Sequence, residues 1–213
     1  MGWVLAAAFL MMSTIFGWNW FRSAPWSARH DLAVAQRLAA HVRVLSSEIG
    51  IRDLEHADQL RRAERYIVEQ FSQAGYIPTS HEYTAVAGIS SRNLIAERPG
   101  REPEEPLVIV GAHYDSCGTP GADDNASGVA SLLELARALD HAQYRRTVRF
   151  IAFVNEEPPF FQTDLMGSRV YARELKRQGG RVRAMLSLET LDYARMAAVV
   201  SGLQAVIKAL AES

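Results

Sequence analysis

One imidazole and five carboxylates stand at, or shortly after, the ends of three apolar runs that are typical of buried strands. They are His113, Asp115, Asp124, Glu156, Glu157 and Glu189. An imidazole together with several carboxylates is a ligand set that suits zinc. A carboxylate can also bridge two metal ions, and one that lies beside a metal-bound water is a plausible general base. The pattern therefore predicts a metal site with hydrolytic chemistry.

The spacing of these residues suggests different roles for them. Asp115 lies two residues after His113, so on an extended strand both side chains point to the same side, where Asp115 can hold the second imidazole nitrogen. Glu156 and Glu157 are adjacent, so one is expected to bind metal while the other reaches the water. Each feature alone has a structural alternative: a strand-end histidine, a helix N-cap at Asp124, or a charged turn before two prolines. Their joint occurrence favours the metal site.

The elements that must position these side chains alternate along the chain. Strands are expected at residues 80–86, 93–97, 107–112, 147–154 and 182–188, and helices at 29–48, 53–74, 127–139 and 167–178, with a short strand and a helix after 193. This order predicts an α/β fold, and ligands of such sheets bind beyond the carboxyl ends of the strands. We expect a mixed, mostly parallel sheet covered on both faces.

The composition of the chain argues against nucleic-acid binding and excludes an intrachain disulfide. The 213 residues are enough for one sizeable domain, and the formal net charge of −1 carries no basic excess of the kind that marks nucleic-acid binding. The single cysteine, Cys117, excludes an intrachain disulfide. Cys117 lies in the predicted metal loop, where a spectator thiol is the favoured interpretation and a thiolate contact with the metal is the alternative.

Four segments together resemble the di-zinc aminopeptidase family of co-catalytic metallo-exopeptidases, over roughly residues 38–193. They are His-Tyr-Asp-Ser at 113–116, Gly-Ala-Asp-Asp-Asn-Ala-Ser-Gly at 121–128, Asn-Glu-Glu at 155–157 and Met-Gly-Ser at 166–168. The resemblance implies a three-layer α/β/α sandwich. It also implies an enzyme that removes N-terminal residues from peptides through a metal-activated water.

The resemblance also implies a role for each site residue. His113 and Glu157 would each bind one zinc, Asp124 would bridge both, and Glu189 would occupy the place of the next carboxylate ligand. Glu156 would be the general base and Asp115 the partner of the His113 ring. A cis peptide bond is expected between Asp124 and Asn125.

The chain departs from the family pattern in one respect. The family has a further histidine ligand well beyond the carboxylate at Glu189, whereas the six histidines of this sequence end at His141. We therefore expect a catalytic domain, residues 23–213, that lacks its C-terminal part, with one well-held zinc and a weak second site. A glutaminyl-cyclase-like acyltransferase and a truncated, catalytically impaired homologue are the alternatives. The Gly-x-Ser-x-Gly signature of many serine hydrolases does not occur.

The apolar N-terminal segment indicates a signal peptide or a membrane anchor. Residues 3–21 are mostly apolar and uncharged, so residues 1–22 are expected to form a signal peptide or a membrane anchor, with a buried first helix as the alternative. Arg22 and Arg29 favour a cytoplasmic C-terminal side, whereas the family resemblance favours an extracytoplasmic location, which we expect. Pro158, Pro159, Phe160 and Phe161 are expected to line an apolar wall for substrate or, alternatively, to pack in the core.

Overall fold

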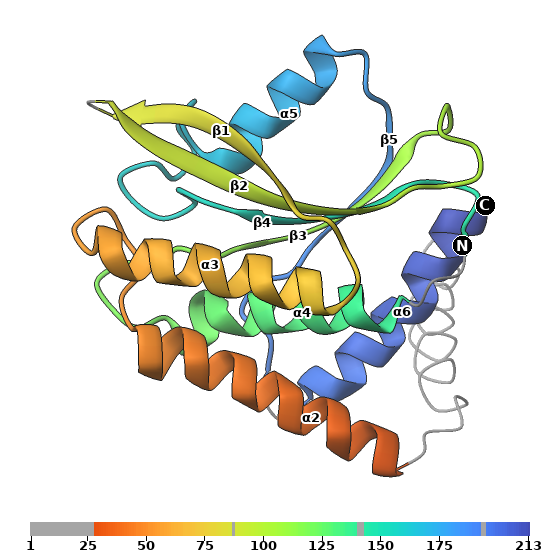
Figure 1. The fold of residues 1–213 in the computed structure, drawn as a ribbon, viewed down its shortest axis with the longest axis horizontal. Coiled ribbons are helices and arrows are strands. Elements are labelled where there is room, and N and C mark those ends of the chain that lie inside the picture. Colours follow the sequence, from red (N-terminus) through yellow and green to blue (C-terminus); the bar gives the residue numbers. More distant parts are fainter. Residues whose placement is uncertain (1–27, 87, 140–142, 193–194) are drawn as a thin grey trace, which may run out of the picture.

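A five-stranded mixed sheet forms the centre of the computed structural model, which describes residues 28–86, 88–139, 143–192 and 195–213 (Figure 1). The strands are β1 (Thr79–Val86), β2 (Ile89–Arg98), β3 (Leu107–His113), β4 (Val148–Phe153) and β5 (Val182–Ser187), in the order β1-β2-β4-β3-β5. β3 is parallel to β4 and to β5, β2 is antiparallel to β4, and β1 is antiparallel to β2. All strands except β2 therefore run in one direction, which confirms the mixed, mostly parallel sheet.

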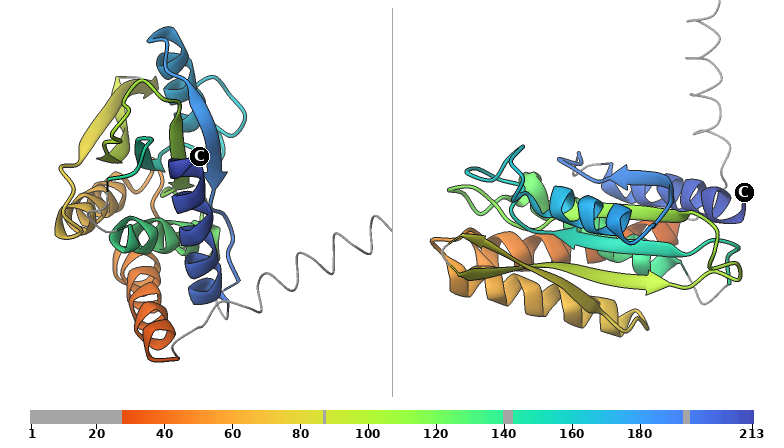
Figure 2. Two further views of the ribbon diagram at one scale, coloured as in Figure 1. Left: turned by 90° about the vertical axis from the view of Figure 1, so that its right-hand side faces the viewer. Right: turned by 90° about the horizontal axis from the view of Figure 1, so that it is seen from above.

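Helices cover both faces of the sheet. α5 (Gly167–Arg177) lies on one face, and α3 (Ala57–Gln73), α4 (Gly128–Ala138) and α6 (Met196–Glu212) lie on the other. α2 (Ala28–Arg43) packs against α4 and α6, farther from the sheet than α4. The side view in Figure 2 shows α5 above the sheet and α4 and α2 below it. The predicted three-layer α/β/α arrangement is confirmed.

The burial of the strands follows from this covering. β3 and β4 lie inside the sheet and are buried along almost their whole length, as expected when helices cover both faces. β5 is at the edge of the sheet, and its burial alternates in its second half, with Ala184 and Leu186 half-buried and the other residues of the strand exposed. The most deeply buried strands are therefore β3, which ends in His113, and β4, which leads into the two adjacent glutamates.

The chain after residue 195 differs from the sequence-based expectation. A single helix, α6, replaces the predicted short strand and helix. Val199 and Val200 are β-branched, a residue type that locally favours extended backbone. The buried residues Met196, Val200, Ile207 and Ala211 instead recur at helical spacing and pack toward α2 and α4. Packing of this apolar face outweighs the local preference.

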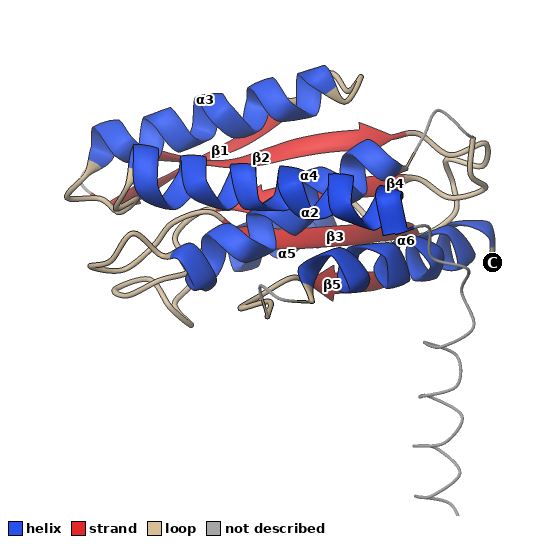
Figure 3. Ribbon diagram, turned by 90° about the horizontal axis from the view of Figure 1, so that it is seen from below, coloured by secondary structure: helices blue, strands red, loops and turns tan. Residues whose placement is uncertain are grey.

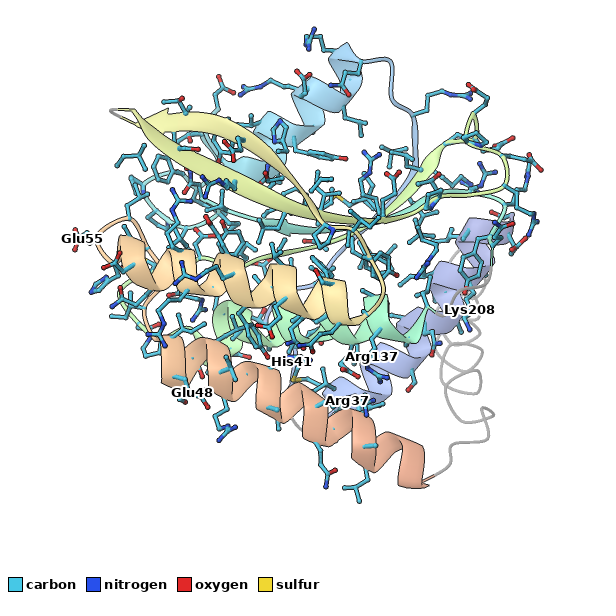
Figure 4. The ribbon with its side chains drawn as sticks, viewed as in Figure 1. Arg37, His41, Glu48, Glu55, Arg137 and Lys208 are labelled. Carbon is cyan, nitrogen blue, oxygen red and sulfur yellow. The ribbon has the colours of Figure 1, made fainter. Side chains whose placement is uncertain are left out.

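A buried carboxylate joins α2 to α4. Glu134 on α4 is 1% exposed and accepts hydrogen bonds from Arg37 and Arg137, each at 2.9 Å. His41 Nε2 lies 3.5 Å from it. Burial disfavours the charged carboxylate, but the hydrogen bonds from these three side chains outweigh that effect and lower the pKa of Glu134 to about 2. Figure 4 labels Arg37, His41 and Arg137 where the two helices face each other.

The predicted N-terminal membrane segment, residues 3–21, lies outside the described residues. Within the described part of the chain, no helix has the length and apolar character needed to cross a membrane.

Candidate metal centre

The carboxyl ends of the parallel strands bring the predicted site residues to one edge of the sheet. His113 is the last residue of β3 and pairs in register with Phe153, the last residue of β4. The loops that follow these strands carry Asp115 and the two glutamates, 156 and 157. Figure 3 shows loops beyond the arrowhead of β5, the strand whose continuation carries Glu189. The predicted placement at strand ends is confirmed.

His113 is at the centre of the cluster. It is 4% exposed, and neither of its ring nitrogens has a hydrogen-bond partner of good geometry among the described residues. Its Nε2 lies 3.0 Å from Asp124 Oδ1, 3.4 Å from Glu189 Oε1 and 3.7 Å from Glu156 Oε2. Several carboxylates therefore converge on one imidazole nitrogen.

The opposite ring nitrogen faces Asp115. His113 Nδ1 is 3.5 Å from Asp115 Oδ1. The other oxygen, Asp115 Oδ2, accepts a hydrogen bond of 3.0 Å from the backbone N–H of Glu157. Asp115 is 5% exposed, so it is held between the imidazole and the loop after β4. This is the arrangement that orients a histidine ligand through its second nitrogen.

Two overlapping sets of three side chains have ligand atoms within 4.8 Å of one another. One set is His113, Glu156 and Glu189, and the other is His113, Asp124 and Glu157. Every residue that the sequence nominates as a ligand or as the general base therefore belongs to at least one set. Cys117 is exposed and belongs to neither.

Burial and the crowding of carboxylates raise the pKa values of the two adjacent glutamates. Burial, together with the charges of Glu189, Asp115 and Glu157, raises the pKa of Glu156 to about 7 even though His113 opposes the shift. Burial followed by the charge of Asp124 also raises the pKa of Glu157.

The pKa of His113 is raised as well, which for an imidazole favours the protonated, charged form. Burial lowers its pKa, but the close contact with Asp115 and the charges of Asp115, Glu156 and Asp124 outweigh this effect and raise the pKa to about 9. A cation in this cluster would relieve the repulsion between carboxylates and would use the unpaired imidazole nitrogen. The residues present therefore fit a zinc ion.

Asn125 connects the Asp124 segment with the segment before Glu189. The Asp124–Asn125 peptide bond is cis, as the resemblance predicts. The buried Asn125 side chain donates to the Leu188 carbonyl at 2.9 Å and accepts from the Gly128 N–H at 3.0 Å. Its hydrogen bonds therefore fix two of the carboxylate-bearing segments relative to each other.

Arg52 supports the site, and sequence reasoning missed it. It is fully buried and donates to five backbone carbonyls, those of Leu45, Gly50, Tyr114, Pro120 and Gly121, at 2.6–3.2 Å. Its backbone also exchanges hydrogen bonds with Ser116. Arg52 thus holds both ends of the loop that runs from Asp115 toward Asp124. No sequence signal marks it, because its acceptors are backbone atoms.

Two of the cavities formed by the described residues lie on different parts of the molecule. The larger, about 600 Å³, lies between the β1–β2 hairpin, β4 and α5, and none of the six site residues lines it. The smaller, about 480 Å³, includes Asp115 and Glu157 in its wall. The smaller cavity is therefore the one that adjoins the candidate metal centre.

Comparison with known proteins agrees with this geometry. An uncharacterized protein of Escherichia coli, YfbL, is 40% identical over 200 residues, which cover 89% of this chain and 59% of that protein. Leucine aminopeptidase 1 of Trichophyton rubrum is 29% identical over 198 residues, which cover 79% of this chain and 50% of that enzyme. The chain thus spans between half and three fifths of the length of these relatives.

Solved structures share the fold. A glutaminyl cyclase of Fimbriiglobus ruber superposes with a TM-score of 0.61 at 19% identity, covering 72% of this chain and 60% of that one. A leucine aminopeptidase precursor of Bacteroides thetaiotaomicron gives a TM-score of 0.56 at 22% identity, covering 75% and 62%. The sequence profile of peptidase family M28 matches residues 93–212, which include all six site residues. The chain belongs to peptidase family M28.

Proposed function

We propose that this protein is a zinc-dependent aminopeptidase that hydrolyses N-terminal residues from peptides. The observation that carries the proposal is the convergence of carboxylates on the buried, unpaired His113 at the carboxyl ends of the parallel strands. Membership of family M28 and the leucine aminopeptidases among its relatives support the reaction class.

We propose that the ligands are His113, Asp124, Glu157 and Glu189, and that Asp115 orients the His113 ring. When bound, zinc supplies Lewis-acid chemistry, polarising the scissile carbonyl and lowering the pKa of a water. Glu156, which is half-buried and 3.7 Å from His113 Nε2, takes a proton from the attacking water and delivers it to the leaving amine. Its neighbour Glu157 is free for the ligand role.

One zinc is expected to be held well. Both sets of candidate ligands contain His113, and its Nδ1 faces Asp115, so only Nε2 is directed at the other carboxylates. One imidazole nitrogen binds one ion, so the two sets are alternative surroundings for the same zinc.

Hydrolysis of leucine 4-nitroanilide by the zinc-loaded protein tests the proposal. We expect turnover that a chelator abolishes and added zinc restores. Glu156→Gln is expected to lower kcat by about 100-fold or more, the usual contribution of a positioned acid–base group, with bound zinc unchanged. Full turnover in Glu156→Gln would refute its role as the base.

A glutaminyl-cyclase-like acyltransferase is the second candidate, because solved glutaminyl cyclases share the fold. Pyroglutamate formation on a Gln-initiated peptide, without hydrolysis of the anilide, would decide for it. A catalytically impaired homologue that only binds metal is the third candidate. It would bind zinc while producing neither product.

We infer an extracytoplasmic location from the apolar residues 3–21 and from the family resemblance. A fusion of alkaline phosphatase after about residue 30 tests this directly, since that enzyme folds only where disulfides form. Active phosphatase is expected, and an inactive fusion that accumulates in the cytoplasm would contradict the location.

A further inference from the structure

The cavity of about 480 Å³ beside the metal centre has no role in the chemistry described above. Its wall includes Asp115, which faces His113, and Glu157, a proposed ligand. A peptide whose scissile bond lies at the cluster would therefore have one of its flanking groups next to this cavity. A cavity continuous with a catalytic centre is the usual place for a substrate side chain.

One side of the cavity is apolar. Leu60 and Phe160 are 7% and 5% exposed, and Leu54, Pro158 and Pro159 extend the same surface. Of the four residues expected to form an apolar wall, Pro158 to Phe161, the first three line the cavity, whereas Phe161 is 50% exposed and does not. An aliphatic chain would pack against this wall.

The charged residues that line the cavity all have the same sign. They are Asp53, Glu55, Asp115 and Glu157, and no lysine or arginine among the described residues lines the cavity. Asp53 lies 2.7 Å from His56 Nδ1, whereas the exposed Glu55 makes no ion pair within the described part of the chain. Asp115 is 5% exposed, and its two oxygens face His113 Nδ1 and the Glu157 N–H, so it adds negative charge to the cavity rather than a free acceptor.

We propose that this cavity is a substrate subsite that receives a basic side chain, lysine or arginine, beside the scissile bond and disfavours an acidic one. The inference rests on the proposed peptidase function. Lysine and arginine place an apolar stem against apolar surface while the charged head reaches polar groups, which matches a wall of leucine, proline and phenylalanine next to carboxylates. An acidic side chain would face the carboxylates of Asp53 and Glu55, which have no role at the metal centre, and such repulsion is a strong source of discrimination.

Four tripeptides test the subsite on both sides of the bond. They are Leu-Lys-Gly and Leu-Glu-Gly, in which the second residue varies, and Lys-Leu-Gly and Glu-Leu-Gly, in which the first residue varies. For at least one pair, the zinc-loaded protein is expected to show a kcat/KM for the lysine peptide about 10-fold or more above that for the glutamate peptide. Glu55→Lys is expected to reduce that ratio to about 1 or to invert it.

Glu48→Lys is the matched control. Glu48 is another exposed glutamate, in the π-helical segment Val44–Ile49 that follows α2 (Figure 4), and it does not line the cavity. The Glu48→Lys substitution changes the net charge by the same amount as Glu55→Lys. Its ratio of kcat/KM for the lysine peptide to kcat/KM for the glutamate peptide is expected to stay at the wild-type value. An equal fall in both variants would assign the preference to net charge and overturn the subsite.

Binding separates this inference from the proposed function. Calorimetry with the zinc-loaded Glu156→Gln variant measures the affinity of each tripeptide, and hence the preference for lysine over glutamate, without turnover. If no peptide is hydrolysed by the wild type but the lysine peptide still binds about 10-fold more tightly, the aminopeptidase proposal fails and the subsite stands. If binding and kcat/KM show no preference for lysine, or if Glu55→Lys leaves the preference unchanged, the subsite is wrong.

Discussion

Replacing the buried Arg52 with Met should destabilise the protein by about 2–4 kcal/mol. The five hydrogen bonds to backbone carbonyls are worth together about 5 kcal/mol at ~1 kcal/mol each. Burial lowers the pKa of Arg52 to about 10 from 12.5, a cost to the charge of about 3 kcal/mol, which Met does not carry. The buried carbonyls that lose their donor add to the destabilisation, because an unsatisfied buried acceptor costs about 1–3 kcal/mol.

Urea unfolding measures this effect. With a slope of about 1–3 kcal/mol/M, the midpoint of the Arg52→Met variant should fall by about 1–2 M. The matched control is Arg62→Met, since Arg62 is exposed and makes one hydrogen bond, to the Glu48 carbonyl. Its midpoint should change by less than about 0.3 M, because exposed substitutions are usually close to neutral. A midpoint for Arg52→Met that matches the Arg62→Met control would refute the reasoning.

Three further predictions concern Glu134, Gly128 and Asp115. The pKa of Glu134 is lowered to about 2, so its stabilisation, at most about 3 kcal/mol, is complete above pH ~4.5 and is lost as the pH falls toward 2. The difference in urea midpoint between wild type and Glu134→Gln should therefore shrink from pH 6 to pH 3, and a constant difference would contradict it. Gly128→Ala would place a Cβ 2.4 Å from the Leu188 carbonyl oxygen, so we expect a loss of about 2 kcal/mol or more in thermal or urea unfolding. A neutral result there would show that the backbone can shift. Asp115→Asn, which weakens the hold on His113, should lower zinc affinity about 10–100-fold in a chelator competition, whereas unchanged affinity would remove Asp115 from the orienting role.

The strand ends were the most predictable part of this molecule. Apolar runs that end in a histidine or in paired glutamates predicted β3 and β4 and the meeting of their polar residues at one edge. The alternation of strands and helices predicted the layers as well. These features depend on local pattern and on general rules of sheet topology, so one sequence is enough to show them.

The features that sequence reasoning missed depend on distant parts of the chain. Arg52 binds backbone carbonyls contributed by residues from Leu45 to Gly121, and nothing in their side chains identifies them as partners. The short strand expected after residue 193 was wrong, because burial against α2 and α4 favours a helix there. Local preference was a weaker guide than packing, which only the assembled fold reveals.

The direct test of the central claim is the zinc content of the purified protein and of its His113→Ala variant. Metal analysis and chelator competition are expected to find one tightly held zinc in the wild type and none in His113→Ala, whose fold is checked by circular dichroism. His81→Ala, which changes a half-buried histidine of β1 outside both ligand sets, should keep its zinc. Tight zinc in a folded His113→Ala variant, or two tightly held zincs in the wild type, would contradict the account.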